Sequence, residues 1–208
     1  CLVFTCVVAA GYVLFYRDPE LRHDGAPMSL VAGLRHLSPQ IWMLGLVWLF
    51  WNAGALVLLT FANDLLVGRG MSPQSAGTMA SVLMFFPILG STFMGHVLDH
   101  RRWQRRGVAL ACLMFAALAV LLGLSSGNIV VLFLGVSFSF ALAPAGIFAL
   151  APHLMHGRES GLGYGALAGM LNIGVLFGPA IGGIVRDATG TYLASFIMAG
   201  VLTSIGAA

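Results

Sequence analysis

The residues of this chain best suited to chemistry lie between positions 95 and 106, in the segment GHVLDHRRWQRR. His96 and His100 are four residues apart, a spacing that places two imidazoles on one helix face and can hold a metal ion. His153 and His156 also have a helix-face spacing. No Glu follows His96 as in the H-E-x-x-H zinc motif, and the nearby arginines would repel a dication. We therefore predict no metal site.

The same segment joins a glycine and an aspartate to two pairs of cations. Gly95 precedes Asp99 by four residues. The cations are Arg101, Arg102, Arg105 and Arg106. A glycine permits close packing at a helix end, and a carboxylate can accept charge-assisted hydrogen bonds from an arginine or a neighbouring helix N-terminus. The pattern is typical of a loop that fixes how two helices meet.

Other catalytic patterns cannot be found in the sequence. The chain has no phosphate-binding Gly-rich loop followed by Lys, and no Ser nucleophile with a positioned base can be identified. The segment GLGYG at 161–165 predicts a flexible loop that enters a helix, and without a preceding strand it is not a dinucleotide-binding turn. We predict that the protein is not an enzyme and that it binds no cofactor.

The composition indicates what must position these residues. Of the 208 residues, 59% are hydrophobic and 8% are charged, against roughly 25% charged in soluble domains, so we predict a multi-span membrane protein. The arginines lie in short loops between apolar runs, which favours a role in topology and excludes a nucleic-acid partner. The three cysteines lie inside apolar runs, so we expect no disulfide. The chain begins at Cys1 and stops at Ala208 inside such runs, and we expect it to be a fragment.

Apolar runs of about 20 residues are typical of helices that cross a bilayer. They predict an all-α polytopic protein with one incomplete span followed by six more. The predicted spans cover 1–16, 40–62, 75–95, 107–124, 128–151, 164–185 and 192–208. Residues 17–39 are the one long polar connection, and we predict that they link two helix bundles. The segment 108–124 is apolar apart from one cysteine, so we expect it to face lipid.

The positive-inside rule orients these spans. Arg69 and Arg186 lie on one side, and the eight other arginines lie in the linker and in loops on its side. We predict a protein of the plasma or inner membrane in which linker 17–39 and loop 96–106 are cytoplasmic. No span has an acidic or basic residue near its centre, and Asp64 is expected at the membrane interface. A carboxylate that could bind a proton or another ion at membrane depth is therefore not expected in this chain.

One span, a cytoplasmic linker and six spans, the second and third joined by G-x-x-x-D-x-R-R, resemble the second half of a major facilitator superfamily transporter. Residues 1–16 resemble the end of the family's sixth helix, and 40–208 resemble its seventh to twelfth. The family's loop motif is G-x-x-x-D-R-x-G-R-[RK]; here His100 replaces the first basic residue and the internal glycine is absent. The resemblance implies a six-helix transmembrane bundle, preceded by a truncated helix, that moves a small solute by alternating access. The implied partners are the solute, the lipid bilayer and an N-terminal half of the same protein.

The resemblance also gives the 95–106 segment a role. It implies that Gly95, Asp99 and the two arginine pairs latch one conformation of a rocking transporter. The alternative is that the arginines only fix topology, and the two roles are compatible.

A second motif, GVLFGPAIGG at 174–183, places small residues along one helix face. The glycines are Gly174, Gly178, Gly182 and Gly183. Pro179 frees a backbone carbonyl and bends the helix. The motif is similar to the antiporter signature of the family's fifth helix, but it lies in the eleventh. We predict close packing at the interface between the halves, with a direct role in antiport as the alternative.

Polar residues at membrane depth are candidates for contact with the solute, because each costs free energy unless it faces a cavity or a partner. Asn52 and Asn172 lie near the middle of their spans, and Trp48 lies one turn before Asn52. Ser137 and Ser139 share another span. We predict that these five residues line the substrate cavity. Interhelical hydrogen bonds for the asparagines and packing for the tryptophan remain alternatives.

Two other functions stay open on sequence grounds. One is a membrane-embedded receptor or enzyme, and the other is a truncated remnant that transports nothing. The sequence does not indicate the solute or the coupling ion.

Overall fold

The computed structural model describes residues 30–124, 128–155 and 160–206, and within these ranges it contains helices and turns but no strand. The helices are α2 (Leu30–His36), α3 (Pro39–Gly68), α4 (Pro73–Ser81), the 3₁₀ turn η1 (Val82–Met84), α5 (Phe85–His100), α6 (Gln104–Leu124), α7 (Ile129–Leu154), α8 (Ser160–Thr189) and α9 (Tyr192–Ile205). The predicted all-α fold is confirmed. The expected span 1–16 and most of the expected linker lie outside the described residues.

Five stretches are long and apolar enough to cross a membrane. They are α3, the continuous run Pro73–His100, α6, α7 and α8, and α9 is a shorter apolar helix. The chain is therefore a multi-pass membrane protein. Helix α8 begins at Ser160, so the expectation of a loop at 161–165 was wrong: these glycines continue a helix.

Proline and glycine fix several helix ends. Pro39 and Pro73 begin α3 and α4, where the missing backbone N–H costs nothing. Gly70 and Gly190 follow α3 and α8 with φ of +89° and +70°, backbone angles that favour glycine. At the same turn as Gly70, Arg69 Nη2 donates to the backbone oxygen of Leu122 at 2.6 Å. That bond ties the end of α3 to the C-terminal carbonyls of α6.

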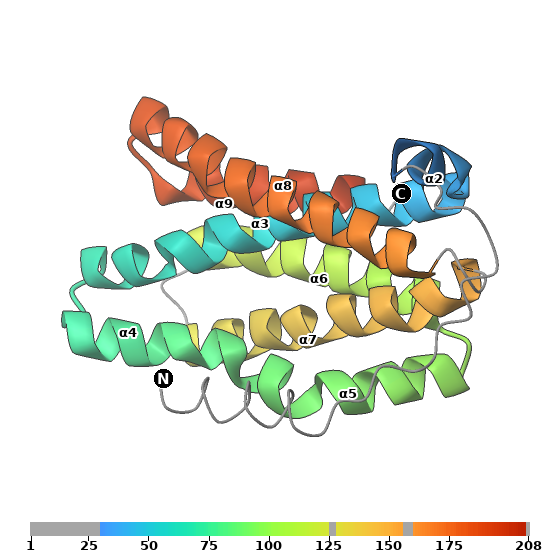
Figure 1. The fold of residues 1–208 in the computed structure, drawn as a ribbon. Coiled ribbons are helices and arrows are strands. Elements are labelled where there is room, and N and C mark those ends of the chain that lie inside the picture. Colours follow the sequence, from blue (N-terminus) through green and yellow to red (C-terminus); the bar gives the residue numbers. More distant parts are fainter. Residues whose placement is uncertain (1–29, 125–127, 156–159, 207–208) are drawn as a thin grey trace, which may run out of the picture.

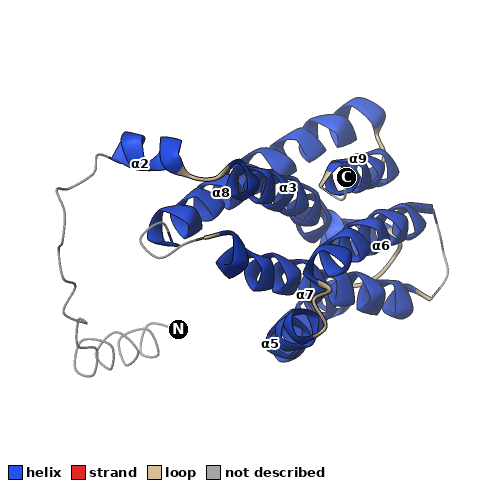
Figure 2. Ribbon diagram, turned by 90° about the vertical axis from the view of Figure 1, so that its right-hand side faces the viewer, coloured by secondary structure: helices blue, strands red, loops and turns tan. Residues whose placement is uncertain are grey.

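The long helices lie side by side and form an arc (Figures 1 and 2). Along the arc, α8 packs on α3, α3 on α9, α9 on α6, α6 on α7 and α7 on α5. Helices α8 and α5 are thus the two ends of the arc, and α3 is the most buried of the five long apolar stretches.

The centre of the bundle is aromatic. Trp51 of α3 packs edge-to-face on Phe115 of α6, with ring centroids 5.4 Å apart, and on Phe140 of α7, at 6.0 Å. Phe115 is fully buried, so α6 does not face lipid all round. One side of α6 packs on α7 and α9, and the other side exposes Leu110 and Leu113. The expectation that 108–124 faces lipid is therefore compatible with one face of α6 only.

Candidate functional site

Asp99 lies at the end of α5, where the sequence predicted an arginine or a helix N-terminus as its partner. Its Oδ1 accepts a hydrogen bond from Gln104 Nε2 at 2.9 Å, and Gln104 is the first residue of α6. The same oxygen lies 3.7 Å from His153 Nε2 on α7. Within the described ranges, the partners of Asp99 are therefore an amide and an imidazole, and no arginine pairs with it.

The arginines of the 95–106 segment point to solvent. Arg101, Arg102, Arg105 and Arg106 are exposed, and the guanidinium of Arg101 lies 5.7 Å from the ring centroid of Trp103. Arg102 has φ of +55° in the tight turn between α5 and α6. This placement is compatible with topology determinants. Arg102 bonds to Asp99 through the backbone, where its N–H donates to the Asp99 carbonyl oxygen at 3.0 Å, and in the described part of the chain none of the four guanidinium groups pairs with the Asp99 carboxylate.

Gly95 is packed less tightly against its neighbours than its place in the motif suggested. A Cβ built on it would lie 3.9 Å from the backbone oxygen of Ala145, an ordinary contact distance. The tight glycine here is Gly146 of α7, whose Cβ would lie 2.7 Å from a methyl of Val108 and 3.1 Å from the backbone oxygen of Gln104. The sequence pattern did not identify Gly146, because its partner comes from a different helix.

A groove of about 630 Å³ lies on the surface between α5 and α7, at the end that carries Asp99. Its polar lining comes mainly from Ser91, Thr92, His96, Asp99 and His153. Phe148 and two prolines supply apolar walls. The volume lies in the range of small-molecule sites. We name this space the α5–α7 groove.

Trp48 and Asn52 form one unit on α3. Asn52 Nδ2 donates to the backbone oxygen of Trp48 at 2.7 Å, and both residues are buried. Trp48 meets Phe148 of α7 edge-to-face, with centroids 5.7 Å apart, and Phe148 stacks at 6.5 Å on Tyr164 of α8. Phe148 and Tyr164 are 47% and 39% exposed, so they carry this aromatic row from the core to the surface.

Asn172 lies on the exposed surface of α8, and its Nδ2 donates to the backbone oxygen of Ala168 at 2.8 Å. Its side-chain oxygen has no partner among the described residues. The structure does not pair Asn172 with Asn52, since each amide bonds to its own helix.

Ser137 and Ser139 are fully buried in α7. Ser139 Oγ donates to the backbone oxygen of Val136 at 2.6 Å. Ser137 Oγ instead accepts from the backbone N–H of Phe86 at 3.1 Å. Phe86 lies in the first turn of α5, just after the 3₁₀ turn η1 within the span Pro73–His100. Ser137 therefore stabilises the start of α5 by accepting from a backbone N–H beside this turn.

The glycines of 174–183 pack α8 on α3 of the same bundle. A Cβ on Gly178 would lie 2.6 Å from Ala53 Cα, and one on Gly174 would lie 3.1 Å from Ala53 N. A Cβ on Gly182 would meet two methyls of Val57 at 3.0 Å. Close packing was predicted for these residues, but at the interface between the halves. A Cβ on Gly183 would lie 3.9 Å from Phe61, so this glycine is packed less tightly. Pro179 lies inside the continuous α8.

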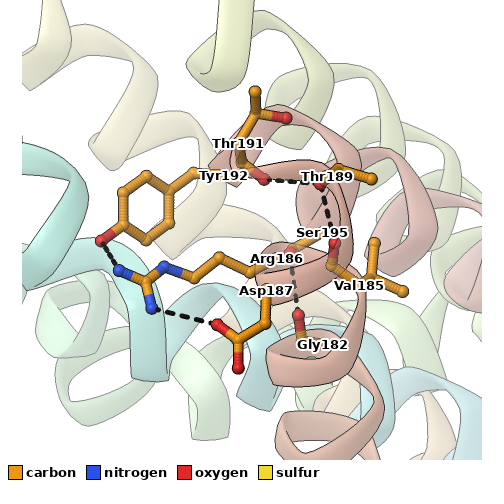
Figure 3. Close-up of polar contacts among 8 residues, drawn as sticks. All are labelled: Gly182, Val185, Arg186, Asp187, Thr189, Thr191, Tyr192 and Ser195. Atoms are coloured by element: carbon orange, nitrogen blue, oxygen red, sulfur yellow. Dashed lines mark hydrogen bonds and ion pairs between the residues drawn. The ribbon is translucent and has the colours of Figure 1, made fainter.

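The turn from α8 to α9 is held by Arg186 and Tyr192 (Figure 3). Arg186 Nη2 donates to Tyr192 Oη at 3.0 Å, and its guanidinium lies 4.8 Å from the centroid of that ring. Arg186 Nη1 is 3.5 Å from Asp187 Oδ1. Below the turn, Ser195 Oγ donates to the backbone oxygen of Gly182 at 2.9 Å and ties α9 to α8.

Residues 42–208 match the sequence model of the Major Facilitator Superfamily. The chain belongs to this superfamily. Members are membrane transporters and not enzymes, which agrees with the five long apolar helices. No curated protein matches the chain closely enough to name a relative.

The contacts described above can be considered together as parts of one bundle of this superfamily. Within this bundle, the glycine-packed α3–α8 pair, the aromatic row and the α5–α7 groove lie next to one another, because Phe148 takes part in both the row and the groove. In this part of the chain, no three His, Cys, Asp or Glu side chains are grouped to hold a metal ion, and His156 lies outside the described residues.

Proposed function

We propose that the chain is one bundle of a secondary transporter and moves a small solute by alternating access against a second bundle. The superfamily match carries this proposal. The two ends of the arc support it, because α5 and α8 present large apolar side chains that no described helix covers. These side chains are Phe85, Ile88, Leu89 and Phe93 on α5, and Ile173, Leu176, Phe177 and Ile184 on α8. The N-terminal half of the same protein is the proposed partner for these faces, and lipid covers the remainder.

The proposed solute contacts lie on the side of the bundle where α3, α7 and α8 meet. Trp48 and Asn52 form its floor, and Asn172 presents from α8 an amide oxygen that bonds to none of the described residues. Phe148 and Tyr164 are added to the five residues predicted from the sequence, since both are exposed, Phe148 meets Trp48 edge-to-face, and Tyr164 stacks on Phe148. Ser137 and Ser139 are the weakest of the five, because both hydroxyls already bond to backbone atoms.

Alternating access can be tested by labelling single cysteines in the full-length protein, in proteoliposomes of known orientation. Asn172→Cys, at the proposed cavity, should react with a membrane-impermeant maleimide from either side, because each state opens the cavity to one side. Leu113→Cys is the matched control, since Leu113 is 57% exposed but lies near the middle of α6, on its outer face. It should react from neither side. Reaction of Asn172→Cys from one side only, under every condition and with every solute of an uptake panel, would contradict the proposal.

We propose that the protein lies in the plasma or inner membrane. In the proposed orientation, the linker 17–39 and the loop 96–106 face the cytoplasm. Trp103 is 48% exposed in that loop, and Gln74 is exposed at the opposite end of the bundle. In intact cells, Gln74→Cys should react with an impermeant label and Trp103→Cys should not. The reverse result would overturn the orientation without affecting the transport proposal.

We propose that Asp99 still takes part in a latch, but with partners other than the arginines of the motif. Gly95 and the four arginines surround Asp99 in sequence, but Gln104 and His153 contact it. We assign the holding contacts to these two side chains and a role in topology to Arg101, Arg102, Arg105 and Arg106.

A further inference from the structure

A second groove lies where α2, the start of α3 and the start of α8 meet, on the other side of the bundle from Asp99. Its volume is about 480 Å³, which is within the range of small-molecule sites. Leu34 of α2 and Trp42 of α3 line it, together with residues of α8 between Gly161 and Ile173. All of the lining residues are apolar or glycine. We name this space the α2–α8 groove.

Three glycines keep the α8 side of this groove open. Gly161, Gly165 and Gly169 recur every four residues, so they share one helix face. A Cβ built on any of them would meet no described atom within 4 Å, whereas the space beside Gly174 and Gly178 is filled by the backbone of α3. The three glycines therefore leave a slot along α8 that fits a linear apolar group.

The last turn of α2 adds positive charge at the edge of the groove. Arg35 and His36 directly follow Leu34, and both are exposed. Arginine is always charged and offers five N–H donors, and the histidine ring offers at least one more. The sequences of α2, of 39–46 and of 161–173 contain no Asp or Glu, so this edge favours an anion. Trp42 is half-buried beside it, and tryptophan is enriched where a membrane meets water.

We propose that the α2–α8 groove binds an anionic phospholipid, with one acyl chain in the slot and the phosphate at Arg35 and His36. Anionic lipids of the cytoplasmic leaflet attract cations close to the membrane surface. A helix of the N-terminal half would also cover the three glycines, but it would leave the exposed Arg35 and His36 without a role. The lipid site goes beyond the transport proposal, and only the choice of leaflet rests on the proposed orientation.

Tryptophan fluorescence tests the site in the full-length protein, reconstituted in phosphatidylcholine vesicles without solute. A small fraction of lipid with brominated acyl chains is added, either as phosphatidylglycerol or as phosphatidylcholine. Bromine quenches tryptophan at short range, and the difference between the protein and its Trp42→Phe variant isolates the signal of Trp42. Half-maximal quenching of Trp42 should need about fivefold less phosphatidylglycerol than phosphatidylcholine, because one arginine near the surface contributes about that factor.

Four variants separate the headgroup contact from the slot. Arg35→Gln should remove most of the preference for phosphatidylglycerol, and Arg105→Gln, at an exposed cation of α6, should leave it unchanged. Gly165→Leu should reduce quenching by both lipids, because leucine fills the slot. Gly90→Leu is its control, since a Cβ on Gly90 of α5 also has no atom within 4 Å but lies outside the groove.

Equal quenching of Trp42 by the two brominated lipids would overturn the proposal, because lipid would then surround the protein without selection. Absence of quenching by either lipid would also overturn it, and would indicate that a helix of the N-terminal half fills the groove. An unchanged preference in Arg35→Gln, or unchanged quenching in Gly165→Leu, would contradict it as well. None of these results bears on whether the protein is a transporter, because no solute is present.

Discussion

The two ends of the helix arc are held by different kinds of contact. At one end, Gly174 and Gly178 bring the backbone of α8 against the backbone of α3 at Ala53. At the other, the surface between α5 and α7 is hollowed by a groove of about 630 Å³, and His153 lies 3.7 Å from Asp99 there. A backbone contact has no side chain that can rotate away. We therefore predict that α3 and α8 move as one unit, and that the end of α5 can part from α7 more readily.

The largest effect is expected from Gly178→Leu. The new side chain must enter the space of Ala53 backbone atoms, which cannot yield as a flexible side chain can. Overpacking typically costs about 1–3 kcal/mol and occasionally more, so we expect loss of transport together with a lower unfolding temperature. Size-exclusion chromatography and thermal unfolding of the full-length protein check this. Gly169→Leu is the control, because a Cβ on Gly169 has no atom within 4 Å; equal damage from both variants would contradict the packing argument.

Ser137→Ala should have the next largest effect on stability. It leaves the backbone N–H of Phe86, just after η1, without its side-chain acceptor, and an unsatisfied buried donor costs about 1–3 kcal/mol. Ser139→Ala, two residues away, removes only a hydroxyl that donates within its own helix. We expect it to cost less, because no backbone donor loses its partner. Chemical unfolding of both variants measures the difference, and a larger loss in Ser139→Ala would show that the start of α5 does not depend on Ser137.

Asp64→Asn should have the smallest effect. Asp64 is exposed and lies near the end of α3, beyond the tight contacts with α8, where a single surface charge changes stability by roughly 0.5 kcal/mol or less. If transport is driven by an ion gradient, coupling should persist in this variant. Loss of gradient-driven accumulation, with downhill exchange retained, would show that Asp64 is the coupling site.

The sequence predicted the elements of this fold better than it predicted their partners. Hydropathy alone placed the five long spans, because the bilayer sets both their length and their composition. It did not indicate the 3₁₀ turn η1 inside the span Pro73–His100, since a proline in an apolar run is compatible with a regular or a distorted membrane helix. The hydroxyl that accepts from Phe86 beside this turn comes from Ser137, far along the chain.

In the candidate site, too, the sequence predicted individual residues better than it predicted their partners. The motif identified Asp99, but its imidazole partner is on another helix and carries no motif of its own. The glycine spacing in α8 predicted a close contact, while the choice of α3 as the partner depends on the arc of the bundle. Phe148 and Tyr164 were not selected, because an apolar or aromatic residue in a membrane span looks the same whether it faces a helix, a lipid or a cavity.

The most direct measurement compares the same substitution at the two ends of the arc. Gly178→Ala adds one methyl group against the backbone of Ala53, and Gly95→Ala adds one at an ordinary distance of 3.9 Å from Ala145. Unfolding of both variants in the same detergent should show a loss of about 1–3 kcal/mol for Gly178→Ala. Gly95→Ala should be neutral or gain up to about 1 kcal/mol from the lower entropy of the unfolded chain. Equal losses, or a larger loss at Gly95, would contradict the account of one end closed by backbone contact and one end held by side chains.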